Sequence, residues 1–87
     1  MNSVYSLIYY NTDEVKNSEV IGIFRDREVA IKALIKAAHY EERDGQLLQY
    51  KKPSNDFQSF DQLTQFVTEN SYLEDYDLYR IEHVEFL

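Results

Sequence analysis

The side chains that could do acid–base or metal chemistry are two histidines and a group of carboxylates near the C-terminal end. His39 and His83 lie far apart in the sequence, and a lone histidine is usually a solvated or partly buried residue. Asp75, Asp77 and His83 could meet around a divalent cation, but their spacing matches no metal-binding loop and such ions need more ligands. We therefore predict no metal site.

Catalytic motifs are missing from the chain. It has no Gly-rich phosphate-binding loop, no Gly-x-Ser-x-Gly nucleophile elbow and no cysteine for a metal cluster. An enzyme would need an acid–base pair that converges in a pocket, and the sequence indicates no such pair. We predict a protein that is not an enzyme and that binds no cofactor.

The charge is unevenly distributed. The net charge is −7, with 16 acidic and 9 basic residues, and residues 1–52 sum to zero. Residues 53–87 carry eight acidic residues against Arg80 alone, so the whole net charge lies in this part. One interpretation is a solubilising surface. The other is an acidic face for a basic protein partner, which would imitate nucleic-acid phosphates, formed by Glu69, Glu74, Asp75, Asp77, Glu82 and Glu85.

Composition excludes several classes of protein. The 87 residues, 44% of them hydrophobic, predict a single globular domain over residues 1–87. The acidic balance argues against direct nucleic-acid binding, whose footprint is basic. No stretch approaches the ~18 apolar residues of a membrane span, and no basic-then-apolar leader is present. We therefore expect a cytoplasmic protein that binds no membrane.

Three segments have strand character. Val4–Tyr10 and Val20–Phe24 are rich in β-branched and aromatic residues, and we expect them to form a hairpin whose long tip is Asn11–Glu19. Gly22 inside the second run indicates a bulge or a close backbone approach. In the last segment, Tyr76–Leu87, the alternation of apolar residues slips by one near Glu82–His83, which predicts a β-bulge or two short strands.

Two helices are expected between these strands. The first begins at the capping residue Asp26 and ends at Gly45. Its apolar positions cover roughly 240° of arc, far more than the ~100° of a helix on one surface. It should therefore contact the sheet and also a second helix or another chain. The second helix, residues 60–69, begins with Ser59 and Gln62 spaced as in a capping box.

These elements predict an α+β fold in the order β-β-α-α-β. Its sheet is mainly antiparallel and has three strands, or four if Gln46–Tyr50 pairs, with two helices on one face. Tyrosines on strands suit both cross-strand packing and protein interfaces. We predict an interaction or structural protein that binds a protein partner or a second copy of itself. The interacting residues are expected to be Tyr5, Tyr9, Tyr10, Ile31, Ile35 and Tyr79.

The first part of the chain resembles a known group of proteins. The resemblance is carried by Val4-Tyr5-x-Leu7-Ile8-Tyr9, Val20-Ile21-Gly22-Ile23-Phe24 and Asp26-Arg27-Glu28-x-Ala30-Ile31-x-Ala33. A Tyr-rich hairpin that leads into an Ala-rich helix, over about residues 4–38, resembles small uncharacterised proteins of large DNA viruses and phages. The resemblance implies a viral origin, with a location in the host-cell interior or the virion. It implies no catalytic residues.

Overall fold

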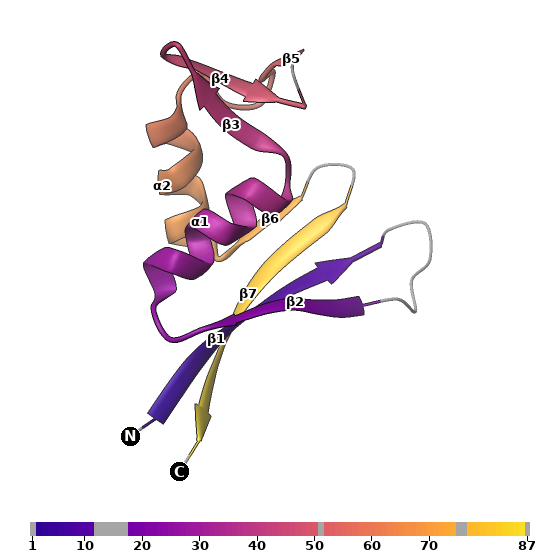
Figure 1. The fold of residues 1–87 in the computed structure, drawn as a ribbon, viewed down its shortest axis with the longest axis vertical. Helices are drawn as coiled ribbons and strands as arrows, with labels where there is room; N and C mark the ends of the chain where they lie inside the picture. Colours follow the sequence, from indigo (N-terminus) through magenta and orange to yellow (C-terminus); the bar gives the residue numbers. More distant parts are fainter. Residues whose placement is uncertain (1, 12–17, 51, 75–76, 87) are drawn as a thin grey trace.

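The fold is elongated, and its two helices lie against one face of a twisted antiparallel sheet (Figure 1). The structure is a computed structural model that describes residues 2–11, 18–50, 52–74 and 77–86. The tip of the first hairpin (residues 12–17), Asp75, Tyr76 and Leu87 lie outside these ranges. The elements are β1 (Asn2–Tyr10), β2 (Ser18–Phe24), α1 (Arg27–Ala37), β3 (Tyr40–Arg43), β4 (Gln46–Gln49), β5 (Lys52–Pro53), α2 (Phe60–Asn70), β6 (Tyr72–Glu74) and β7 (Leu78–Phe86).

The main sheet has four strands in the order β2-β1-β7-β6, and all neighbours are antiparallel. β1 and β7 pair along their whole lengths, from Asn2 opposite Phe86 to Tyr10 opposite Leu78, with no shift of register. The bulge or strand break predicted near Glu82 is therefore wrong. The slip in alternation has another cause, because β7 carries apolar side chains first on one face of the sheet and then on the other.

The β1–β2 hairpin is confirmed, and Gly22 has both of the roles predicted for it. The register shifts between Leu7 and Ile8, which places a bulge in β2 next to Gly22. A Cβ atom at Gly22 would lie 2.6 Å from the ring of Phe24. Glycine is favoured here because any larger residue would have to displace this ring.

Helix α1 begins as predicted and ends earlier. The side chain of Asp26 accepts a hydrogen bond from the Glu28 amide and caps the first turn. The helix stops at Ala37, because His39 has a left-handed backbone with φ 66°. The predicted end at Gly45 is wrong. Gly45 instead forms, with Asp44, the two-residue turn of the β3–β4 hairpin, where both have positive φ as such turns require.

A second sheet replaces the loop expected between the helices. Strands β3, β4 and β5 form a three-stranded antiparallel sheet. This sheet follows the C-terminal end of α1 and lies away from the two ends of the chain (Figure 1). The extended segment predicted near Gln46–Tyr50 is present, but it pairs with β3 and β5 and not with the main sheet. The α+β class is thus confirmed, while the order β-β-α-α-β and the single sheet are wrong.

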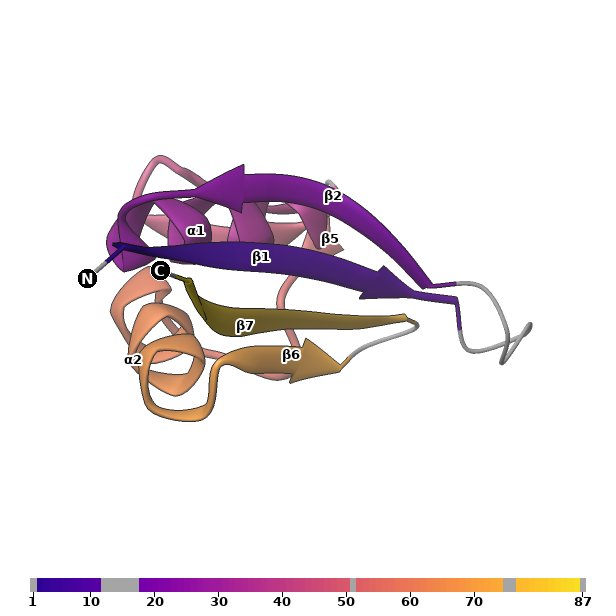
Figure 2. The same ribbon diagram turned by 90° about the horizontal axis from the view of Figure 1, so that it is seen from below.

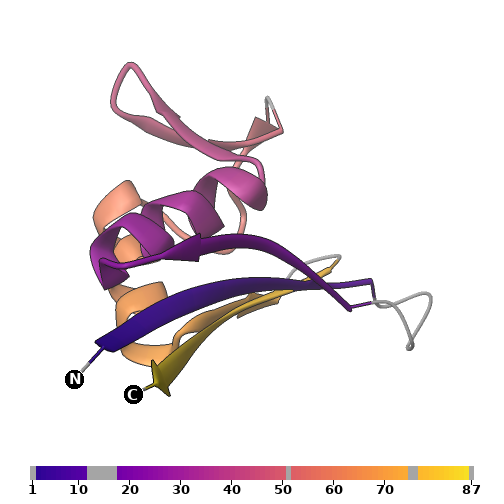
Figure 3. The ribbon, with the colours of Figure 1, turned by 60° about the horizontal axis from the view of Figure 1, so that its bottom comes forward.

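The helices bury one face of the main sheet and are tied to each other. α1 contacts β1, β2 and β7 on one side and α2 and β3 on others, which accounts for its wide apolar arc (Figure 3). The Ser59 hydroxyl caps α2 by accepting from the Gln62 amide, as predicted. Arg27 of α1 donates to the Thr68 carbonyl at 2.6 Å and to the Ser71 hydroxyl at 2.8 Å. It supplies the positive charge that the last turn of α2 itself lacks.

The buried residues form one hydrophobic core. Fully buried side chains come from the sheet and from both helices, and no polar residue among those described is buried. Among the described residues, no helix is both long enough and apolar enough to cross a membrane. The core consists of Leu7, Ala30, Ile31, Leu34, Ile35, Ala38, Tyr40, Leu47, Leu63, Val67, Leu73, Tyr79 and Ile81.

Candidate functional site

The face of the main sheet that points away from the helices is uncovered (Figure 2). Alternation along paired strands assigns residues to this face, because residues directly opposite each other share a face. Leu7 is buried under the helices, so its neighbours Ser6 and Ile8, and their partners on β2 and β7, lie on the other side. This surface, called the open face below, carries Val4, Ser6, Ile8, Tyr10, Val20, Ile23, Tyr72, Glu74, Leu78, Arg80, Glu82, Val84 and Phe86.

The open face is apolar and its large side chains are exposed. Ile23 is 64% exposed, Val20 55%, Phe86 47% and Val84 40%. Its charged residues are Arg80 and Glu82 on β7, which form an ion pair with each other, and Glu74 on β6. A largely apolar surface of this kind is typical of a protein-interaction site.

The edges of the main sheet are less suited to binding than its face. β2 is one edge strand, and the bulge beside Gly22 interrupts its regular hydrogen-bonding pattern. The other edge strand, β6, is only three residues long. Bulges and short strands are the usual protections against edge-to-edge pairing, so a partner is favoured to dock on the face.

The predicted interaction residues do not lie together on this face. Tyr9 and Tyr79 point toward the helices, with ring centroids 5.3 Å apart, and Tyr79 is buried. Tyr5 lies on the same side and stacks on His83 at 4.8 Å. Ile31 and Ile35 are buried between α1 and its neighbours. Of the predicted set, Tyr10 alone lies on the open face, opposite Leu78.

The acidic residues of the C-terminal part are distributed over several elements. Glu69 lies on α2, where it accepts a hydrogen bond from Gln65, and Glu74 lies on β6. Glu82 and Glu85 lie on β7 and point to opposite faces, because three positions separate them. Asp77 lies beside β7, next to a hollow described below. Asp75 lies outside the described residues.

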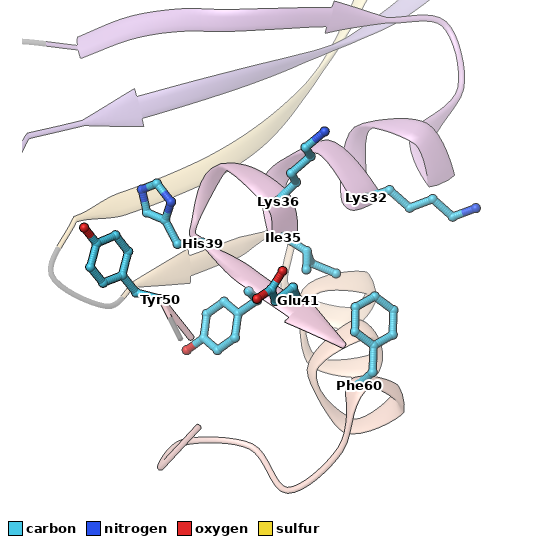
Figure 4. A pocket seen from close by; sticks show the side chains of 8 residues that line it. Lys32, Ile35, Lys36, His39, Glu41, Tyr50 and Phe60 are labelled. Atoms are coloured by element: carbon cyan, nitrogen blue, oxygen red, sulfur yellow. The ribbon is translucent and has the colours of Figure 1, made fainter. Parts of the chain in front are cut away.

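A second candidate surface lies on the far side of α1. Two adjoining hollows of about 490 and 470 Å³ share His39 and Tyr50 as lining residues. Figure 4 shows the imidazole of His39 beside the ring of Tyr50, with side chains of α1 and Phe60 around the first hollow. The two hollows together are called the His39–Tyr50 cleft. Residues lining the first are Lys32, Ile35, Lys36, His39, Tyr40, Glu41, Tyr50 and Phe60, and the second adds Lys52, Asn55 and Asp77 among others.

His39 and Tyr50 both have left-handed backbones and are held together. Their φ angles are 66° and 48°, a conformation that costs a residue with a bulky side chain about 1–2 kcal/mol relative to its usual region. The Tyr50 amide donates to the His39 carbonyl at 2.9 Å, and the two rings meet edge to face at 5.8 Å. Asp44 and Gly45, in the neighbouring turn, are residue types that tolerate such angles.

Lysines lie at the rim of this cleft without ion-pair partners among the described side chains, and Figure 4 shows the Lys32 and Lys36 side chains extending away from His39 and Tyr50. Among the described residues, Lys32, Lys36 and Lys52 form no ion pair, including the Glu28–Lys32 pair that helical spacing favours. Glu41, the acidic residue of the first hollow, is bound by Arg43 at 2.9 Å. The first hollow is therefore positively charged although the protein as a whole is acidic.

Sequence reasoning missed most of the residues that form these two surfaces, although Tyr10 and Glu82 were among those it singled out. For the open face, the signal was the slip of alternation in the last strand. It places Val84 and Phe86 on the opposite side of the sheet from Tyr79 and Ile81. For the cleft, no local pattern was available, since Tyr50 looked like the end of an irregular segment. Its exposure of 75% is visible only in the fold.

No group of three or more potential metal-binding side chains converges among the residues that the structure describes. Comparison of the chain with protein-family models, curated proteins and solved structures gives no match. The resemblance to viral and phage proteins stays a prediction.

Proposed function

We propose that this protein is a non-enzymatic interaction protein whose open face binds a second copy of the same chain. The observation that supports this most directly is the row of exposed apolar side chains on three adjacent strands, β2, β1 and β7. Two such faces pack in layers about 10 Å apart in proteins, with side chains from both sheets interdigitated.

The size of the open face suits a weak dimer. Its strands have nine, seven, nine and three residues, which at about 3.3 Å per residue and 4.8 Å between strands cover roughly 450 Å² of plane. Two copies would bury roughly twice this plane, close to the ~1,000 Å² at which specific interfaces begin. The expected dimer is therefore concentration-dependent, with an affinity in the micromolar range.

The charges of the open face suit a second copy better than a charged partner. A two-fold interface brings residue i against j and j against i. An axis between Arg80 and Glu82 would bring Arg80 of one copy to Glu82 of the other, so the face is complementary to itself. Glu74 is the one further charged residue that strand pairing places on this face among those described, so a strongly basic partner would find little attraction there.

The alternative of a nucleic-acid-mimicking inhibitor has less support. Such a protein needs its carboxylates gathered on one surface, whereas Glu82 and Glu85 point to opposite faces of β7. The two functions also differ in salt dependence. Two copies of net charge −7 repel each other, so added salt should strengthen the dimer, while salt would weaken binding to a basic partner.

Sedimentation equilibrium tests the proposal with a matched pair of variants. Val20 on the open face is 55% exposed and Val29 on α1 is 48% exposed, so Val20→Lys and Val29→Lys make the same change at similar exposure. Between about 10 and 500 µM, a range that brackets the affinity of a small interface, the wild type and Val29→Lys should approach twice the chain mass. Val20→Lys should remain at one chain mass.

Two results would overturn the dimer. One is a wild-type mass of a single chain at the highest concentration, at both low and high salt. The other is an equal effect of the two substitutions, because association would then not depend on the open face. Circular dichroism of each variant verifies that the fold is retained.

A further inference from the structure

We propose that the His39–Tyr50 cleft binds a small organic anion that carries a planar ring, such as an aryl or nucleoside phosphate. Tyr79, on the helix side of β7, lines the second hollow, and no residue of the open face lines either hollow, so this site is independent of dimer formation. Each hollow falls within the roughly 300–1,000 Å³ typical of small-molecule sites.

The backbone at the centre of the cleft indicates that its side chains are needed. His39 and Tyr50 have conformations that glycine adopts freely, yet the chain has an imidazole and a phenol there. The turn at Asp44–Gly45, in the same small sheet, has residues that suit its geometry. Positive φ is usual at both places, since His39 follows the end of α1 and Tyr50 lies in the turn from β4 to β5. At Tyr50 the chain has a large aromatic ring where glycine would suit the backbone best, and this ring is the side chain we assign to the ligand.

The ring of Tyr50 adds little to the packing of the fold. It is 75% exposed, and its ring contact is with His39. The base of the first hollow is apolar, formed by Ile35 and Tyr40, which are buried, with Phe60 partly buried beside them. An exposed aromatic ring above an apolar base is suited to stacking on a planar group.

The cations around the cleft determine the charge of the ligand. Lys32 and Lys36 line the first hollow, where Glu41 is already neutralised by Arg43, whereas the second hollow has both Lys52 and Asp77. The excess positive charge is therefore at the first hollow. Lys36 lies in the last turn of α1, where a cation also complements the helix dipole, but Lys32 does not. Ammonium groups without carboxylate partners beside an aromatic surface favour an anionic ligand with a ring.

Nuclear magnetic resonance titration with three probes separates the contribution of the ring from that of the anionic group. Adenosine monophosphate presents a ring and a dianion, adenosine the ring alone, and inorganic phosphate the dianion alone. We expect saturable shifts of the His39, Tyr50 and Lys36 amides with adenosine monophosphate, and binding weaker by about tenfold or more with adenosine alone or with phosphate alone. Shifts of equal size with phosphate alone would indicate non-specific lysine binding and overturn the proposal.

Substitution of Tyr50 by glycine separates a binding role from a structural one. Because glycine adopts a φ of 48° without strain, Tyr50→Gly should raise or leave unchanged the melting temperature and should weaken adenosine monophosphate binding by about tenfold. Lys36→Gln should also weaken binding, whereas Arg25→Gln, a matched loss of charge outside the cleft, should not. A clear fall in melting temperature for Tyr50→Gly, or unchanged binding, would overturn the proposal.

Discussion

The two faces of the main sheet are built from the same strands but have different relations to the rest of the protein. On the covered face, Leu7 and Ile81 are almost completely buried under the helices. On the open face, Val84 and Ile23 are equally apolar and remain exposed. The difference shows that hydrophobic residues on a strand do not by themselves identify the core, and the uncovered set is the one available to a partner.

The largest expected difference between the faces is in the cost of losing a side chain. Leu7→Ala should lower the free energy of unfolding by about 3 kcal/mol, because it leaves a cavity in the core. Ile23→Ala, on the open face, should cost less than about 0.5 kcal/mol. Urea unfolding, at a concentration where the chain is monomeric, measures both. Equal losses would mean that the open face is also packed within the monomer.

A smaller loss of stability is expected at Gly22, where the ring of Phe24 leaves little room for a side chain. Gly22→Ala should lower the free energy of unfolding by about 1–2 kcal/mol, since the new methyl group must displace the ring of Phe24. In a Phe24→Ala background the same substitution should cost much less. Urea unfolding of the four proteins gives this double-mutant cycle, and additive losses would show that the ring does not restrict this position.

The contact of Arg27 with the end of α2 should contribute to the free energy of unfolding about as much as one charged hydrogen bond. Arg27→Gln removes the donor to the Thr68 carbonyl and should cost about 1 kcal/mol. Arg25→Gln is the control, because it removes an arginine close in sequence but outside this contact. Thermal unfolding compares them, and matched melting temperatures would show that the contact does not stabilise the helices.

The smallest effect is expected at the charges of the open face. The Arg80–Glu82 pair is half-exposed, so Arg80→Gln should change monomer stability by less than about 0.5 kcal/mol. If the pair is exchanged between copies, the same substitution should weaken the dimer measurably in sedimentation equilibrium. A stability loss above this value without any change in association would assign the pair to the monomer alone.

Local signals in the sequence predicted the local parts of the fold. The caps at Asp26 and Ser59 and the glycine at Gly22 each act within a few residues, and all three are confirmed. The end of α1 was not predictable in the same way. His39 stops the helix in a conformation that favours glycine, and the strands that follow are held by pairing with each other.

The candidate surfaces depended on information that no single segment contains. Tyr10 and Tyr9 are neighbours, and which of them faces a partner is decided by the side of the sheet on which the helices pack. Likewise, Tyr50 reaches His39 only because β3 and β4 form a hairpin. Composition correctly located the net charge in the C-terminal part, but pairing and strand direction spread those carboxylates over several surfaces.

The pairing of β1 with β7 joins the first and last strands at the centre of the main sheet. Closing a loop of this length has a high entropy cost, and contacts between distant segments slow folding. We expect the β1–β2 and β3–β4 hairpins to form first, and a φ-value near one for Ile81→Val would contradict this order. A chain in which β7 has not yet docked would present the unpaired edge of β1 beside an apolar face, an arrangement prone to aggregation.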